Sequence, residues 1–238
     1  LLLMLAQLIL AIKGEVVMSS DLADALTAVF EAKVPNTWVF TIAGDEFSWI
    51  LPTLGLWVTS LMARDDQNRT WMNHARPVGF WMTGFFNPQG MLTAMKQEVT
   101  RKHKKEQWAL DDVVYHTEVT GMQGKENLRG APEEGIYVYG LFLDGSAWSK
   151  HDGVLEEQAP KKLFSALPVM YVSANIGTAQ NKVNKDMFGP QGPYESPVYK
   201  YPMRNDRFFI FYANLKCTAE KPPLFWGLRG TALLENTD

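Results

Sequence analysis

The chain has 238 residues, of which 46% are apolar and 21% are charged, a composition that is ordinary for a globular protein with a sizeable core. Its length allows one large domain or two small packed lobes. The formal net charge of -3 and the isoelectric point of about 5.9 give no sign of nucleic-acid binding, and we expect no nucleic-acid partner. The single cysteine, Cys217, excludes an internal disulfide and a zinc site built from several cysteines.

The sequence begins with an apolar run, LLLMLAQLILAI, that ends at Ile12. This run is shorter than the ~20 residues that span a bilayer, and no basic segment precedes it, so we expect neither a membrane span nor a signal peptide. An apolar run of this length is typical of a buried core helix. Because the sequence does not begin with Met, we expect a helix cut part-way along, in a piece of a longer polypeptide.

A second helix is predicted after Gly14, which ends the first one. Ser19 or Ser20 can cap it, because a serine hydroxyl accepts a hydrogen bond from a free N–H at a helix start. The spacing of its apolar residues predicts one buried face, made of Leu22, Ala25, Leu26, Val29 and Phe30.

A third helix is predicted from near Pro52 towards Asn73, because proline is tolerated in a first turn. The segment RDDQNRT, residues 64–70, is polar on all sides, and we expect it to face water or a partner. The apolar stripe of this helix consists of Leu54, Trp57, Val58, Leu61 and Met62.

Residues 79–86, GFWMTGFF, are too apolar for an exposed strand, so we expect a buried segment that is either extended or a short helix. Asn87 and Pro88 suit the cap and first turn of a further helix, which the basic run at 101–105 closes. We interpret residues 79–95 as the joint between a helical half and the remainder. If Trp81 is fully buried, Trp81→Ala is expected to be strongly destabilising.

After residue 107 the pattern changes to short segments rich in β-branched and aromatic residues, separated by turn-forming residues. These segments predict an all-β half, either a barrel or a sandwich. Long loops are expected at 121–135 and 175–197, and the second is longer than most loops in compact domains. Strands are predicted in DDVVYHTEV, GIYVYGLFLDG, LPVMYVSAN, RFFIFYANLK and FWGLRGTALLE, with a further strand in GSAWSKHDGVLEE.

The sequence lacks the common motifs for phosphate binding and catalysis. Gly124-Lys125 comes nearest to a phosphate-binding loop, but the upstream glycine and the following Ser or Thr are missing. Neither the dinucleotide motif GxGxxG nor the nucleophile motif GxSxG occurs. We therefore expect no catalytic residue, no cofactor site and no enzyme activity in this polypeptide.

The histidines lie far apart without the paired spacing of metal ligands, so we expect no metal site. Of these residues, His103 lies in the basic run and is expected at a solvated helix end. The four histidines are His74, His103, His116 and His151.

Other reactive or aromatic residues also have simple structural interpretations. The acidic pairs Asp111-Asp112 and Glu133-Glu134 are expected to be turn and surface charges, because adjacent strand residues point to opposite faces. Cys217 is expected to be a small packed residue rather than a nucleophile. Tryptophans could line the mouth of a binding barrel, but large aromatics dominate cores, so core positions are expected for Trp38, Trp57, Trp81, Trp148 and Trp226.

Several motifs follow one another along the sequence: KGEVVMSSDLADAL, KVPNTW, RPVGFWMTGFFNPQGMLTAMKQEVTRKHK, EEGIYVYGLFLDGSAWS, LPVMYV, PVYKYPMR and LRGTALL. In this order they resemble the C-terminal domain of dynein heavy chains over essentially the whole length. The most distinctive parts are residues 80–97 and 135–148. The segment PVYKYPMRNDRFFIF is more similar to axonemal than to short-tailed fungal cytoplasmic dyneins.

The resemblance implies an α+β fold in which a helical subdomain, residues 1–106, precedes an antiparallel β-barrel subdomain, residues 107–238. It implies a non-catalytic domain that follows the sixth AAA+ module, packs across one face of the motor ring and regulates microtubule-based motility. The ATP sites and the microtubule-binding stalk belong to other parts of such a heavy chain, which is a microtubule-stimulated ATPase.

The implied partners are the AAA+ modules of the same heavy chain, with other dynein subunits as further candidates and microtubules reached only through the parent motor. The implied location is the cytoskeleton of a ciliary or flagellar axoneme, after assembly in the cytoplasm. An alternative is an independent β-barrel binding module for a peptide or small ligand, or a small enzyme. Either would need a pocket with converging polar groups.

Overall fold

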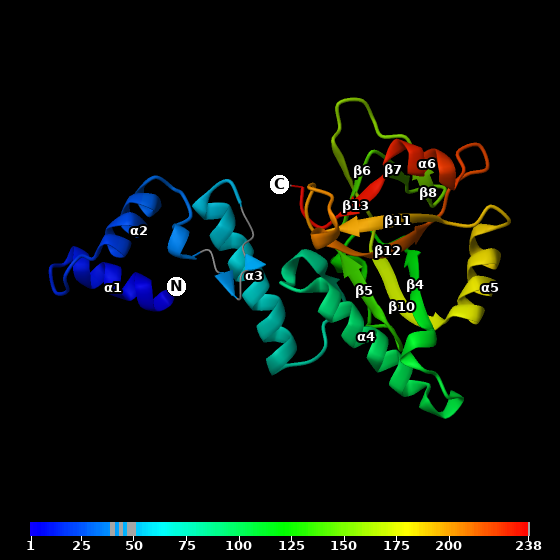
Figure 1. The fold of residues 1–238 in the computed structure, drawn as a ribbon, viewed down its shortest axis with the longest axis horizontal. Helices are drawn as coiled ribbons and strands as arrows, with labels where there is room; N and C mark the ends of the chain where they lie inside the picture. The colour runs from blue at the N-terminus through cyan, green and yellow to red at the C-terminus, as the bar shows by residue number, and fades with distance from the viewer. Residues whose placement is uncertain (39–40, 43–44, 47–50, 238) are drawn as a thin grey trace. The chain divides into compact units, whose positions relative to one another are not determined.

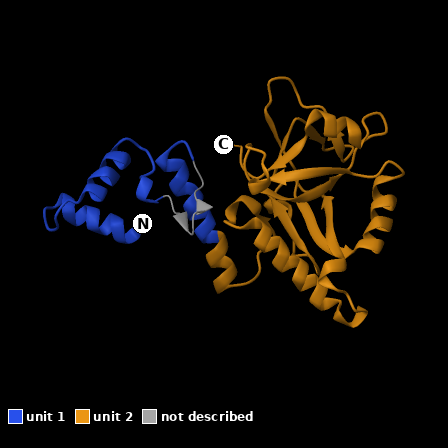
Figure 2. Cartoon of the chain, in the orientation of Figure 1, with its two compact units in different colours: residues 1–66 blue, residues 67–238 orange. Residues whose placement is uncertain are grey.

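The computed structural model describes residues 1–38, 41–42, 45–46 and 51–237. The protein divides into two compact units, residues 1–66 and residues 67–238 (Figure 1, Figure 2). The division falls inside helix α3 (Leu54–Asn73). The expected subdomains, residues 1–106 and 107–238, place their boundary elsewhere, and they stay a prediction about how the protein is organised.

Unit 1 is mainly helical. Helices α1 and α2 pack on each other through Leu8, Ala11 and Leu22. The Ser19 hydroxyl accepts a hydrogen bond from the main-chain N–H of Leu22 at 3.3 Å, which confirms the predicted cap. The elements of this unit are α1 (Leu2–Ile12), α2 (Ser20–Phe30), the 3-10 turn η1 (Asn36–Trp38), β1 (Thr41–Ile42), β2 (Asp45–Glu46) and the start of α3.

The apolar run at the start of the sequence is buried on one side only. Leu8 and Ala11 are its buried residues, whereas Leu2 and Leu3 are 81% and 74% exposed. Phe30, predicted on the buried face of α2, is 89% exposed. Periodicity identified these helices, but it did not show how much of each apolar face this unit covers.

Unit 2 contains a mixed arrangement of helices and short strands. Its elements are the end of α3, β3 (Phe80–Trp81), α4 (Pro88–Lys102), β4 (Val113–Val119), β5 (Ile136–Tyr139), β6 (Phe142–Asp144), β7 (Ala147–Ser149), β8 (Val154–Glu156), β9 (Phe164–Ala166), β10 (Met170–Ile176), α5 (Gly177–Phe188), β11 (Tyr194–Tyr199), β12 (Phe209–Leu215), α6 (Pro223–Arg229) and β13 (Ala232–Leu234), with 3-10 turns at 82–84, 104–106, 110–112, 125–127 and 206–208.

The α+β class fits the structure, but the predicted antiparallel β-barrel is wrong. Within the described residues, the strands form a four-stranded sheet in the order β3-β5-β10-β4 and a five-stranded sheet in the order β12-β11-β13-β6-β9, and neither closes into a barrel. Strands β7 and β8 form a separate antiparallel pair. Both larger sheets are mixed, because β3 pairs with β5 in parallel and β11 pairs with β13 in parallel.

The chain passes from one sheet to the other at Gly140, and the two sheets also meet at strands β4 and β12. The stretch predicted as one strand turns at Gly140, where a φ of +84° disfavours any residue with a Cβ. Strand β5 before the turn joins the four-stranded sheet, and β6 after it joins the five-stranded sheet. Strand β4 is an edge of the four-stranded sheet and β12 an edge of the five-stranded sheet, and these two edges share no ladder. Instead, the main-chain N–H of Asn214 donates to the hydroxyl of Thr117 at 2.7 Å.

Helices α4 and α5 cover opposite faces of the β4–β10 pair (Figure 1). Successive strand residues point to opposite faces. Tyr115 therefore lies on the α4 side, where the Lys96 ammonium is 5.9 Å from the centre of its ring, and His116 lies on the α5 side, bonded to Gln180. The α4 side is the main core, into which α4 inserts its buried residues Leu92, Met95 and Val99.

Two segments were assigned wrongly from the sequence. The expected long loop at 175–197 contains helix α5, whose Gln180 and Phe188 are buried within unit 2. The first part of FWGLRGTALLE, predicted as a strand, is helix α6, and Gly230 ends it in the left-handed conformation before β13. Helix α6 has only seven residues, and α5 is a polar segment that begins at a glycine, so neither segment resembles a typical core helix in the sequence and tertiary contacts stabilise both.

The polar segment 64–70 differs from its prediction at two positions. Arg64 is 4% exposed, with its Nε 3.3 Å from the Ser60 hydroxyl. Gln67 bonds to both main-chain groups of Trp81, accepting from its N–H at 2.7 Å and donating to its carbonyl at 3.2 Å. One polar side chain thus completes the pairing of the short strand β3.

The apolar segment at 79–86 was predicted to be either extended or a short helix, and the structure contains both conformations. It forms strand β3 and then a 3-10 turn at 82–84. Asn87 caps α4 by accepting from the N–H of Gly90 at 2.8 Å, as predicted, and Pro88 is the first residue of the helix. The fully buried ring is Phe80, at 1% exposure, whereas Trp81 is half-buried.

We expect Phe80→Ala to lower the free energy of unfolding by about 3–5 kcal/mol, because the truncation leaves a cavity in the main core. Trp81→Ala should cost less, since part of its ring is already in water. Urea unfolding followed by circular dichroism measures both. The control Leu163→Ala removes a side chain that is 75% exposed and should change stability by no more than about 0.5 kcal/mol. A loss below about 1 kcal/mol for Phe80→Ala would contradict its assigned position.

Candidate functional site

The four histidines lie in four different environments. His74 is exposed, and His151 is exposed beside Asp152 in the turn between β7 and β8. His103 and His116 are partly buried and hydrogen-bonded. Among the residues that the structure describes, no three His, Cys, Asp or Glu side chains are grouped as metal ligands would be.

His103 does not lie at a simple solvated helix end. Its ring stacks on Trp108 with the two centres 4.0 Å apart and the planes 12° from parallel. Its Nδ1 lies 3.0 Å from a carboxylate oxygen of Glu106, and its Nε2 lies 2.9 Å from one of Glu134. Both ring nitrogens must carry a proton to donate to these carboxylates. The hydrogen bond to Glu134 is the main cause that raises the pKa of His103, with Glu106 adding to it and partial burial opposing it.

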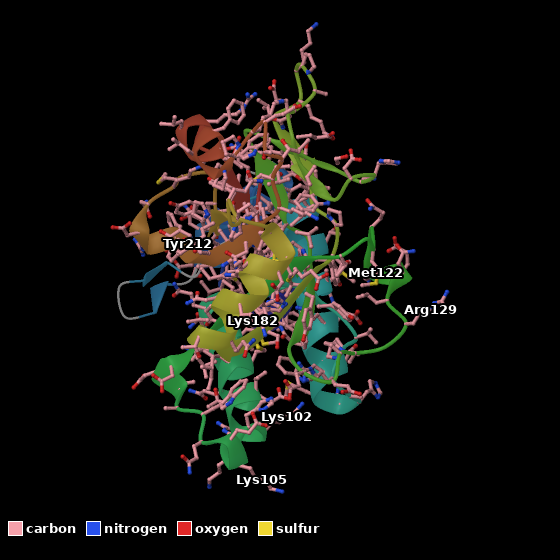
Figure 3. All side chains as sticks on the ribbon, turned by 90° about the vertical axis from the view of Figure 1, so that its right-hand side faces the viewer. Lys102, Lys105, Met122, Arg129, Lys182 and Tyr212 are labelled. Carbon is pink, nitrogen blue, oxygen red and sulfur yellow. The ribbon has the colours of Figure 1, made fainter. Side chains whose placement is uncertain are left out.

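The segment around Glu134 is held by its backbone as well as by this ion pair. Lys102 donates to the carbonyl of Glu133 at 2.6 Å, and the Tyr171 hydroxyl donates to that of Glu134 at 2.9 Å. Figure 3 shows Lys102 and Lys105 at the bottom of the view, where α4 ends. Glu134 was expected to be only a surface charge. Its pairing with His103 joins residues 31 positions apart, a contact that the sequence could not indicate.

His116 belongs to a polar network between α5 and the two edge strands. The amide nitrogen of Gln180 lies 3.0 Å from His116 Nδ1 and 2.6 Å from the amide oxygen of Asn184, which Asn214 also approaches at 3.5 Å. Burial lowers the pKa of His116, which favours the neutral ring that accepts the hydrogen bond from Gln180. The network holds α5 over the open edge between β4 and β12.

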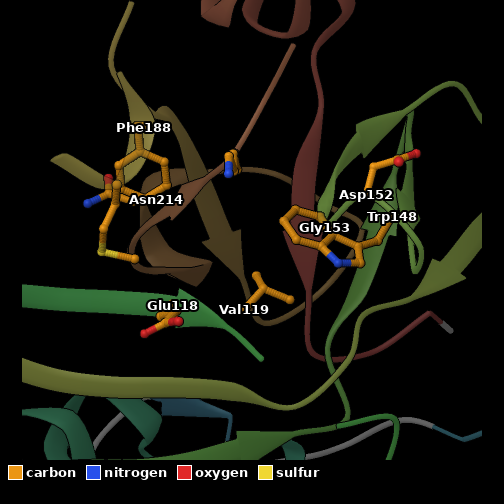
Figure 4. A pocket seen from close by; sticks show the side chains of 9 residues that line it. Glu118, Val119, Trp148, Asp152, Gly153, Phe188 and Asn214 are labelled. Carbon is orange, nitrogen blue, oxygen red and sulfur yellow. The ribbon is translucent and has the colours of Figure 1, made fainter. Parts of the chain in front are cut away.

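A pocket of about 350 Å³ lies next to this network, where β4 and β12 end (Figure 4). The end of α5 and the turn between β7 and β8 complete its walls. Leu155 of β8 donates its main-chain N–H to the carbonyl of Lys216 at 2.8 Å, which fixes the hairpin beside β12. The lining residues are Glu118, Val119, Trp148, Asp152, Gly153, Met187, Phe188, Asn214 and Lys216.

The pocket combines apolar walls with charged groups. Trp148 and Phe188 are buried, and Glu118 and Lys216 are exposed carriers of opposite charge. Hydrogen bonds from His151 and then from the Ser149 hydroxyl lower the pKa of Asp152, so its carboxylate is ionised at neutral pH. Sequence reasoning did not single out these charged residues, because the strands and the helix that bring them together are far apart in the sequence.

Of the other expected core residues, three of the five tryptophans and Cys217 are confirmed, whereas Val58 and Met62 of the predicted stripe on α3 are exposed. Trp57, Trp148 and Trp226 are buried, whereas Trp38 and Trp81 are half-buried. Cys217 is buried in the main core, and burial raises the pKa of its thiol, which disfavours the reactive thiolate.

Unit 1 exposes several apolar side chains at its helices and in the turn between them. None of the described helices has the length and apolar character needed to cross a membrane. The most exposed residues are Leu2, Leu3, Val17 and Phe30, with Ile9 and Ile12 more than half exposed. A surface of this kind is typical of a protein–protein contact.

Residues 3–235 match the family described as the C-terminal domain of the dynein heavy chain. The protein belongs to this family. The resemblance drawn from the sequence motifs is therefore confirmed, although the barrel that it implied is not.

Relatives of this dynein C-terminal domain match nearly all of it. It is 46% identical over 232 residues to dynein axonemal heavy chain 8 of Homo sapiens, a match to 97% of this domain and 5% of that protein. It is 44% identical over 230 residues to dynein axonemal heavy chain 5 of Mus musculus, with matched shares of 97% and 4%. It is 40% identical over 236 residues to the dynein gamma chain, flagellar outer arm, of Chlamydomonas reinhardtii, with matched shares of 98% and 5%. The domain thus spans only a small part of these relatives.

The His103 cluster predicts a pH dependence of stability for this dynein domain. Because the folded-state pKa of His103 is raised, its contribution to stability is fully present below the unfolded pKa of about 6.5 and is lost as pH rises through the folded value. Glu134→Gln should weaken this dependence between about pH 5.5 and 8.5, since the main cause of the raised pKa is removed.

Urea unfolding across that pH range measures the effect, and an NMR titration of the His103 ring measures its pKa. Glu133→Gln is the matched control, because the neighbouring residue takes part through its backbone carbonyl. An unchanged His103 pKa in Glu134→Gln would contradict the assigned ion pair.

Proposed function

We propose that this protein is the non-catalytic regulatory and structural domain at the C-terminal end of an axonemal dynein heavy chain. It packs on the AAA+ motor ring of the same heavy chain and modulates microtubule-based motility in the ciliary or flagellar axoneme. The parent heavy chain is an ATPase stimulated by microtubules, and this domain reaches microtubules only through it. Other dynein subunits are further candidate partners.

The exposed apolar side chains of α1 carry the proposal. Leu2 and Leu3 are 81% and 74% exposed, a costly arrangement for neighbouring leucines unless another surface covers them. The axonemal relatives are far longer than this domain, which supports a covering surface within the same polypeptide. A domain that contacts a ring in this way affects the ring only if the contact differs between nucleotide states.

The absence of catalytic motifs in the sequence agrees with a role in contact rather than chemistry. Phosphate-binding loops, which the rest of a motor ATPase must supply, do not occur in these residues. The domain would act in the cytoskeleton, on the conformation of its neighbour.

A binding module for a peptide or small ligand is the second candidate function, and the pocket beside Trp148 favours it. The space between the two sheets offers no room for a ligand, because buried side chains fill it. They include Met82, Leu143, Met170, Leu215 and Leu233. A ligand would therefore bind at the pocket near the β4–β12 edge, and such binding is compatible with the regulatory function.

The function is tested with Leu3→Glu in an intact axonemal heavy chain that ends in this domain. A charge at an apolar contact should weaken packing on the ring and change both the microtubule-stimulated ATPase rate and the gliding velocity. Gln123→Glu adds the same charge at an exposed polar position of unit 2, outside α1, and should leave both rates unchanged. Equal rates for the original protein and Leu3→Glu would count against the contact.

A second test removes residues 74–238 from the intact motor, so that unit 2 is deleted after the end of α3 and no exposed half of its core is left. Loss of regulation should change ATPase rate, gliding velocity or run length. If all three stay at their original values, the domain does not modulate the motor, whatever surface it covers.

A further inference from the structure

We propose that the pocket at the β4–β12 edge binds an arginine side chain from another segment of the same heavy chain. The proposal rests on the proposed function, in which this domain lies against the rest of a dynein motor. It names the chemistry of one contact that the proposed function leaves open.

The position of the pocket suits an inserted side chain. Strands β4 and β12 end there without a shared ladder, and the last bond between them is the one from Asn214 to Thr117. Next to this bond, a space of about 350 Å³ is lined by the ends of both strands, the end of α5 and the β7–β8 turn. This volume is at the lower end for ligand pockets and is large enough for one long side chain.

The walls match the two parts of an arginine side chain. Figure 4 shows Trp148, Val119 and Phe188 around the hollow, with the carboxylate of Glu118 at one side. Aromatic and aliphatic groups bury the methylene stem of arginine, and aromatic faces also attract its planar guanidinium. The same planar group binds a carboxylate through two parallel hydrogen bonds.

One carboxylate at the pocket is available to a cation. Glu118 and Asp152 are negative and Lys216 is positive, while His151 pairs with Asp152 from outside the pocket. No ion pair of Glu118 occurs among the residues that the structure describes. Asp152 is already hydrogen-bonded to His151 and Ser149, so Glu118 is the carboxylate available to a ligand. The positive charge of Lys216 repels a bound cation. Removing this charge should therefore strengthen binding, whereas removing the charge of Glu118 should weaken it.

A segment of the same heavy chain is the most suitable source of the arginine. A single side chain in a half-open pocket binds weakly, with a dissociation constant on the order of 1 mM or above. Within one polypeptide the effective concentration of a tethered group is also in the millimolar range, so a weak contact is occupied. The axonemal relatives carry more than nine-tenths of their length outside the matched region, which supplies such segments.

The pocket is tested on this domain with the peptide acetyl-Gly-Arg-Gly-amide, by following the NMR signal of the Trp148 indole N–H during titration. The matched control peptide carries citrulline, which has nearly the shape of arginine but no charge. We expect saturable shifts with the arginine peptide and much weaker ones with citrulline. Equal binding of both peptides, or preferential binding of a glutamate peptide, would overturn the proposal.

Two substitutions should act in opposite directions. Glu118→Gln should weaken binding of the arginine peptide about two- to fivefold, the range of an exposed ion pair, whereas Lys216→Met should strengthen it by a similar factor. Glu133→Gln changes a carboxylate in the segment beside the end of α4, which does not line the pocket, and should leave binding unchanged. Effects of the same sign in Glu118→Gln and Lys216→Met would contradict the assigned charges.

The source is tested in the intact heavy chain by replacing Lys216 with the photoreactive amino acid p-benzoylphenylalanine. A cross-link to a distant segment of the same polypeptide, at or next to an arginine, is expected. A cross-link to a separate polypeptide, or none, would overturn the intramolecular source. These outcomes are distinct from those of Leu3→Glu, which tests α1 and does not involve the pocket.

Discussion

Burial of one face of α4 is the interaction on which the larger unit depends. Leu92, Met95 and Val99 enter a core that both larger sheets share, so a single helix face stabilises two sheets at once. The segment before the helix contributes Phe80 and Met82 to the same core. The abrupt change from an apolar segment to a capped helix thus has a physical reason: each part must reach the core from a different direction, and Asn87 sets the turn between them.

The two sheets meet at the edge strands β4 and β12, which are neighbours but do not form a ladder. Helix α4 contacts β4, β10 and β12, and so packs across this junction between the sheets. A hydroxyl-to-amide hydrogen bond between Thr117 and Asn214 takes the place of a ladder. The unpaired edges are covered by α5 and by its network of amide side chains. The pocket lies where α5 ends and no longer covers these edges. The β7–β8 turn forms its opposite wall.

The polar clusters have structural roles at the margins of this core. His103 and its two carboxylates hold the segment at Glu134 against the end of α4, and the His116 network holds α5 over the strand edges. Both stabilise connections between elements that are distant in sequence. A domain of the dynein family that transmits contact from its neighbours needs such rigid connections, because coupling between sites passes through packed and hydrogen-bonded elements.

Sequence alone determined the features that depend on local physics or on a family's order of motifs. It identified the first four helices, the cap at Asn87, the change to strands after residue 107, the buried Cys217 and the dynein resemblance. It failed for α5, a polar segment inside an expected loop, and for α6, which has only seven residues. It also failed for the barrel, because alternation shows that a strand exists but not which strand it pairs with. The tertiary structure alone decided that Phe80 rather than Trp81 is fully buried, that Glu134 pairs with His103, and that Glu118, Trp148 and Lys216 share a pocket. Such contacts join residues far apart in the sequence, and no local pattern records which distant side chain will be the neighbour.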